Sequence, residues 1–139
     1  MSIQAVLLPV FLLVLLTFVL GFWTAYLRVQ TVRRGETRPR DIALREPNWP
    51  PHVLKIQYAF QNQLELPLLF YVLTILAWIT KQADLLFLAL AWIFVVLRIL
   101  HASVHVTSNH LGRRAILFIA GAVVLSVMWL VFARRILLA

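Results

Sequence analysis

Polar side chains recur along one apolar stretch of the sequence, and they are the residues best able to do chemistry. Tyr58, Asn62 and Glu65 follow one another between Gln57 and Pro67, where an apolar run opens that continues to about residue 80. Residues three and four apart lie on one face of a helix. A phenol, an amide and a carboxylate on one face can bind a polar ligand or hold a neighbouring helix.

A second polar face occurs in the next apolar run. Arg98, His101 and His105 stand at positions i, i+3 and i+7 of a helix. The two histidines are spaced as metal ligands can be, but the glutamate of an HExxH motif is absent and only two good ligands are present. We therefore expect no metal at this face.

The composition indicates the environment of these residues. Of 139 residues, 63% are hydrophobic and 13% are charged, and the mean hydropathy is +0.91. Such a chain is too apolar for an ordinary soluble domain. The net charge of +8 comes from arginines between the apolar runs, where they signal membrane orientation rather than nucleic-acid binding. The chain has no cysteine, which excludes disulfides and a cysteine nucleophile.

The hydropathy pattern predicts one all-α integral membrane domain, residues 1–139, built as a bundle of four transmembrane helices. The first run begins uncharged and is too long for a signal peptide, so we expect it to stay in the protein. The connections 28–52 and 107–114 hold eight arginines. The positive-inside rule therefore makes them cytoplasmic and puts both termini outside, in a multi-pass protein of the inner membrane. The expected spans are 3–27, 53–80, 85–106 and 115–132, and we expect Pro67 to kink the second of them.

The residues of the two polar faces can be paired by their expected depth in the membrane. Counted at about 1.5 Å per residue from cytoplasmic ends near Lys55 and Ser108, each polar residue of the second span meets one of the third. The pairs are Glu65 with Arg98, Asn62 with His101, and Tyr58 with His105. A lone buried charge is costly, so the sequence predicts a Glu65–Arg98 ion pair. That pair could bind a ligand or only fix two helices in register, and both roles remain open.

The facing residues Tyr58, Asn62, Glu65, Arg98, His101 and His105, which we call the polar seam, are suited to binding a small zwitterion. Glu65 can accept an ammonium group, while Arg98, with Arg113 and Arg114 at the mouth, can hold carboxylates. Glutathione, with two carboxylates and one amine, is such a molecule.

These residues carry a family resemblance over nearly the whole chain. Four spans, a basic first loop, Ala59-x-x-Asn62-x-x-Glu65 and Arg98-x-x-His101 resemble the MAPEG family, the membrane-associated proteins in eicosanoid and glutathione metabolism. The stretches NQLELPLLFYVL and LRILHASVHVTSN are most similar to its bacterial members.

The resemblance implies a homotrimer that holds glutathione between adjacent subunits near the cytoplasmic side. Asn62 and Glu65 match the family's ligand-binding asparagine and glutamate, and Arg98 and His101 match its third-helix arginine and histidine. Arg113 and Arg114 are the nearest candidates for the arginine that stabilises the glutathione thiolate. The remaining two seam residues depart from the pattern, because Tyr58 stands where eukaryotic members have arginine and His105 where they have tyrosine.

Two functions follow as hypotheses. One is a glutathione-dependent, or other thiol-dependent, transferase or peroxidase that acts on lipophilic electrophiles entering from the bilayer. The alternative is a non-catalytic membrane scaffold or accessory subunit whose polar seam fixes helix packing.

Overall fold

The chain folds into helices only. The computed structural model describes all residues 1–139. Its helical elements are α1 (Ile3–Arg33), the 3-10 turn η1 (Pro39–Asp41), α2 (Pro51–Asn62), α3 (Leu66–Ile79), α4 (Leu85–Val106) and α5 (Leu111–Leu137). Four segments are long and apolar enough to cross a membrane: α1, α2 with α3, α4 and α5. The prediction of an all-α protein with four helical segments long and apolar enough to span a membrane is confirmed.

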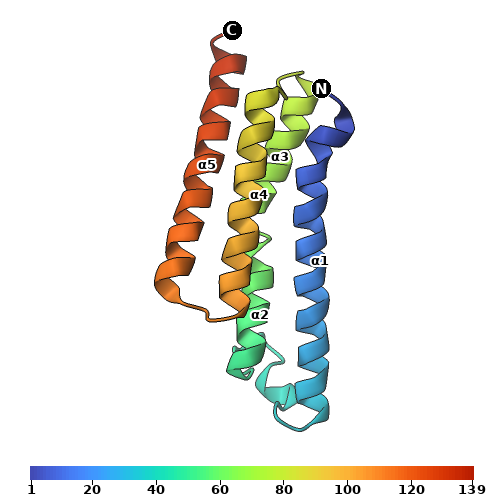
Figure 1. Ribbon diagram of the computed structural model, residues 1–139. Helices are drawn as coiled ribbons and strands as arrows, with labels where there is room; N and C mark the ends of the chain where they lie inside the picture. The colour runs from blue at the N-terminus through green and yellow to red at the C-terminus, as the bar shows by residue number, and fades with distance from the viewer.

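The helices run lengthwise beside one another, with both termini at the same end of the bundle (Figure 1). We call the opposite end, which holds residues 34–50 and the 107–110 turn, the loop end. There α1 and α2 extend beyond the turn that joins α4 to α5 (Figure 1). The loop end thus carries a protruding pair of helices with the long first connection folded between them.

The second span is interrupted in its middle. We expected one helix kinked at Pro67, but α2 ends at Asn62 and α3 begins at Leu66. Backbone hydrogen bonds between residues three apart form a turn across the break. The Leu64 amide donates to the Gln61 carbonyl (3.0 Å), and the Glu65 amide donates to the Asn62 carbonyl (3.4 Å). Proline has no amide to continue the helical ladder, yet it is favoured in the first turn of a new helix, where Pro67 stands.

The apolar core lies where α4 meets the other helices. The Phe70 ring of α3 stacks on the Phe94 ring of α4 with centroids 5.0 Å apart, and both side chains are fully buried. Leu13 of α1 and Leu125 of α5 join the same buried cluster. The core is thus apolar in the half of the bundle that lies toward the termini.

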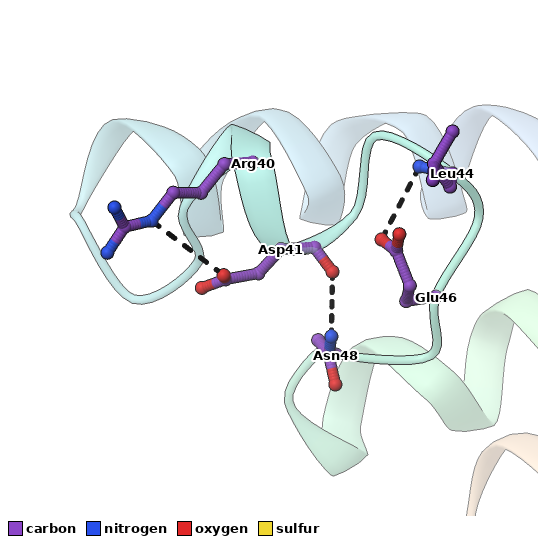
Figure 2. A network of polar contacts seen from close by, with 5 residues as sticks. All are labelled: Arg40, Asp41, Leu44, Glu46 and Asn48. Carbon is purple, nitrogen blue, oxygen red and sulfur yellow. Dashed lines mark hydrogen bonds and ion pairs between the residues drawn. The ribbon is translucent and has the colours of Figure 1, made fainter.

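The first connection is a folded loop. The Asn48 side-chain amide donates to the Asp41 carbonyl (2.7 Å), and the Leu44 amide donates to the Glu46 carboxylate (3.4 Å) (Figure 2). Arg40 lies 3.9 Å from the Asp41 carboxylate in the same network (Figure 2). These contacts hold the connection folded between η1 and the start of α2.

Polar contacts also join the ends of α4 to its neighbours. The Asp84 carboxylate accepts from the Phe87 amide (2.9 Å), which caps α4, and from Arg135 near the end of α5 (2.7 Å). Arg135, and then the Phe87 amide, hold the pKa of the Asp84 carboxyl below its usual range. At the loop end, Lys55 Nζ donates to the Thr107 carbonyl (3.1 Å).

Candidate functional site

Helix α4 places three polar side chains inside the bundle. Arg98, His101 and His105 are 0%, 2% and 3% exposed. Their spacing puts them on the face of α4 that is covered by the other helices, as the sequence suggested. Burial of a guanidinium and two imidazoles costs free energy unless each finds a partner.

Arg98 finds its partner at the end of α2. Its Nη2 donates to both the backbone carbonyl and the Oδ1 of Asn62, each at 3.1 Å. The last carbonyls of a helix lack helical partners and carry the negative end of the helix dipole, so a cation is stabilised there. The Arg98 atoms Nε and Nη1 are buried with no partner in the chain. Arg98 is therefore held on one side and free to bond on the other.

The predicted Glu65–Arg98 ion pair does not form within the chain. The ion pairs present are Arg40–Asp41 and Arg135–Asp84. The break after Asn62 takes Glu65 off the helical face that the spacing assumed, and its side chain is exposed. Glu65 still acts electrostatically on Arg98. The prediction was wrong because it treated the second span as one continuous helix.

The two histidines meet edge to face. The rings of His101 and His105 have centroids 5.7 Å apart at 78°, and Phe118 of α5 lies 6.1 Å from His101. The Nδ1 atom of each histidine is buried without a partner. Since Asn62 bonds Arg98, it is not paired with His101, and Tyr58 is 40% exposed rather than buried beside His105.

The arginines of the second turn differ in position. Arg114 Nη1 donates to Asn109 Oδ1 (2.7 Å), and Arg114 is half-buried, with its charge felt by both buried histidines. Arg113 is exposed, and its amide donates to the Nδ1 of His110, which caps α5 (3.2 Å). Of the two candidates, Arg114 is the one that is half-buried and held by a side chain of the turn after α4.

Two further polar residues, not included among the candidates from the sequence, belong to the same region. Gln63 is 1% exposed, with both side-chain polar atoms unpartnered, and it follows Asn62 directly. The hydroxyl of Tyr71 is also buried without a partner, and Arg98 acts on it electrostatically. The presence of Gln63 in an apolar span was the available signal, but it lies off the Tyr58–Asn62–Glu65 face.

We call Asn62, Gln63, Arg98, His101 and His105 the polar cluster. Nearly all buried polar groups in folded proteins are hydrogen-bonded. This cluster instead gathers unpartnered donors and acceptors from α4 and from the break between α2 and α3. Such a cluster can bind a small molecule that carries carboxylate and amide groups. His101 and His105 belong to no group of three metal-ligating side chains.

Comparison with known proteins places the chain in a family. No curated protein and no solved structure matches it. The model of the MAPEG family matches residues 6–134. Because that match spans nearly all of the 139 residues, the chain is a multi-pass membrane protein that belongs to the MAPEG family.

Proposed function

We propose that this protein is a membrane-embedded transferase or peroxidase that uses glutathione, or another small thiol, against lipophilic electrophiles. Members of the family generally use glutathione. The observation that carries the proposal is the fully buried Arg98, bonded to Asn62 on one side and without partners at Nε and Nη1.

The polar groups suit the chemistry of glutathione. The free nitrogens of Arg98 are donors for a carboxylate, which guanidinium binds well. Glu65 offers an acceptor for an ammonium group from the exposed side of the same break. Gln63 has both a free donor and a free acceptor, as an amide backbone requires. The residues of this chain thus fit such a ligand.

Arg114 is the residue we assign to the reacting sulfur. Bound glutathione supplies a thiol nucleophile, which reacts as its thiolate. A fixed cation next to the sulfur lowers the free energy of that charged form. Arg114 is oriented by Asn109 and reaches the cluster electrostatically, whereas Arg113 is exposed and has the weaker claim. The electrophile reaches this position from the bilayer.

We further propose a homotrimer in the inner membrane, with the loop end in the cytoplasm and both termini outside. Glu65 supports assembly, since it lies near the middle of the Pro51–Ile79 span and is exposed in a single copy. A carboxylate facing lipid is costly. A neighbouring subunit covers it and encloses a ligand between the two copies.

The test of the enzyme role is the ultraviolet absorbance of the thiolate together with conjugation of a lipophilic electrophile. We expect Arg114→Ala to abolish the thiolate band and to lower kcat/KM about 100-fold or more, a usual loss when one charge-stabilising donor is removed. Arg134→Ala removes an exposed arginine from the other end of the bundle and serves as the matched control. Arg114→Ala with an unchanged band would refute the assigned role.

The alternative, a scaffold without catalysis, is favoured by one observation. Arg98 bonds the last carbonyl of α2 and thereby fixes α2 against α4. If that is its whole role, Arg98→Met disrupts assembly and no thiol binds to the intact protein.

A further inference from the structure

A second cationic groove, lined by residues of α1, α2 and the first connection, lies apart from the polar cluster. A groove of about 480 Å³ runs between these helices and the first connection. Arg28 and Arg45 line it, and no acidic residue does. None of the polar cluster residues lines it either, so this inference does not rest on the proposed function.

Arg28 is held in place from two sides. Its Nη2 donates to the Oε1 of Gln57 on α2 (2.6 Å), and its guanidinium carbon lies 4.9 Å from the centre of the Trp49 ring. The Nε atom of Arg28 is buried and bonds nothing. A guanidinium fixed by an amide and an aromatic face, with a free donor, is preorganised for an anion.

Arg45 brings a second cation to the groove from the loop. Its backbone is left-handed (φ 66°), and it lies between Leu44 and Glu46, whose hydrogen bond belongs to the folded network (Figure 2). Arg45 forms no ion pair within the chain. The loop thus presents an unpaired arginine to the groove that also holds Arg28.

The two ends of the groove lie at the expected depths of a lipid headgroup and of its acyl chains. Arg28 lies 25 residues after Ile3, a rise of about 37 Å along a helix, whereas the hydrocarbon core is about 30 Å thick. The two arginines therefore lie at the level of the headgroups. Toward the core the groove is lined by Gly21, Phe60 and Leu64, together with the polar side chains of Thr24 and Gln61. Gly21 leaves room for Phe60, whose ring would lie only 3.0 Å from an added Cβ.

We propose that this groove binds an anionic phospholipid of the bilayer, with its phosphate on Arg28 and Arg45 and one acyl chain along Gly21, Phe60 and Leu64. Charge complementarity selects the headgroup, because two unpaired arginines face one anion. Trp49 holds Arg28 in place at the interface, where tryptophan is favoured. The site serves a bound lipid and takes no part in the thiol chemistry.

The test is native mass spectrometry of the delipidated oligomer, titrated with phosphatidylglycerol or phosphatidylcholine of equal chain length. We expect the anionic lipid to bind about tenfold more tightly, and the double variant Arg28→Ala/Arg45→Ala to lose that preference. Arg38→Ala, which removes an exposed arginine from the same loop, keeps the preference. Equal binding of both lipids by the wild type, or equal loss in Arg38→Ala, overturns the proposal.

Two further arms identify the occupant. Inorganic phosphate should not displace the lipid, and displacement at equal concentration assigns the groove to a free anion instead. Glutathione binding should be unchanged in the double variant, whereas its loss assigns the groove to the thiol site. If the alanine variant fails to fold, the proposal is tested with the Arg28→Lys/Arg45→Lys protein instead. This variant keeps both charges and must therefore keep the preference for the anionic lipid.

Discussion

Arg98 is the residue on which the site depends. A fully buried guanidinium is stable here because the end of α2 gives it two oxygens, both from Asn62. Its remaining donors stay free. One side chain thus joins two helices through Nη2 and keeps Nε and Nη1 free for the ligand that we propose.

This arrangement makes the loss of Asn62 more harmful than the loss of the whole pair. We expect Asn62→Ala to destabilise the protein by about 1–3 kcal/mol, because it leaves a buried charge with fewer partners. Adding Arg98→Met should restore part of that loss, since an apolar side chain of similar length needs no partner. Thermal unfolding in detergent measures both. Strictly additive losses would contradict the cost assigned to the unpaired charge.

The sequence predicted the shared face of the α4 residues of the candidate site better than it predicted their partners. Counting residues along the second and third spans predicted that Lys55 and Ser108 lie at the same depth in the membrane. Lys55 does bond the carbonyl of Thr107, the residue before Ser108. The sequence also placed Arg98 and His101 on one face, and both are buried. It failed at Glu65, because no rule of spacing shows where a span breaks and turns a side chain outward.

At the level of elements, the break between α2 and α3 is the feature that creates the site. It leaves the Asn62 carbonyl with only a 3.4 Å bond from the Glu65 amide, so that the carbonyl also accepts from Arg98. The break also buries Gln63 and exposes Glu65. Pro67 removes the amide that could extend the helix. The sequence predicted a kink from Pro67, but whether a proline bends or divides a helix depends on the partners available to the freed carbonyls.

Replacing this proline should lengthen the helical ladder. We expect Pro67→Ala to slow hydrogen exchange of the amides of residues 63–66, because position 67 can then donate to the Gln63 carbonyl. Exchange followed by mass spectrometry of the peptides covers this segment. Pro47→Ala, in the exposed first loop, is the control and should leave it unchanged. Unaltered exchange in Pro67→Ala would instead assign the break to Arg98.

The contact between Asp84 and Arg135 makes the joining of α4 to α5 sensitive to acid. The folded pKa of Asp84 is lowered, so its stabilising effect is present above the unfolded pKa of about 3.9 and is lost as pH falls below it. Both side chains are partly exposed, so we expect at most about 1 kcal/mol.

The matching variant is Asp84→Asn, which keeps a good helix cap but removes the charge. Thermal unfolding between pH 3 and pH 7 should show a smaller loss of stability on acidification in this variant than in the wild type. Parallel curves for the two proteins would count against the ion pair.

For the whole molecule, the four spans were predictable because length and hydropathy alone determine them. Whether a helix face lies against lipid or against another copy of the chain could not be predicted from the hydropathy pattern, because that pattern does not distinguish the two kinds of face. The exposed Glu65 is the one residue in a span that separates the two, because a carboxylate is costly against lipid. It favours a neighbouring copy at the break.

The absence of cysteine allows a direct test of this assembly. Leu68 and Val123 are 57% and 56% exposed in one copy, and each can be changed to a single cysteine and labelled with a nitroxide. We expect strong dipolar coupling between copies for the label at Leu68, whose amide bonds the Glu65 carbonyl (3.1 Å), and weaker coupling at Val123 on α5. Equal coupling at both positions would contradict a subunit interface at Glu65.

The measurement that tests the central claim most directly is calorimetric titration of the intact detergent-solubilised protein with reduced glutathione. We predict saturable binding that is weakened about tenfold or more in Glu65→Gln and in Arg114→Ala, because each variant removes one charge-assisted contact. Arg134→Ala should bind as the wild type does. No binding of glutathione at millimolar concentration would contradict the assignment of the polar cluster to this ligand. Equal binding by all four proteins would contradict the contacts assigned to Glu65 and Arg114.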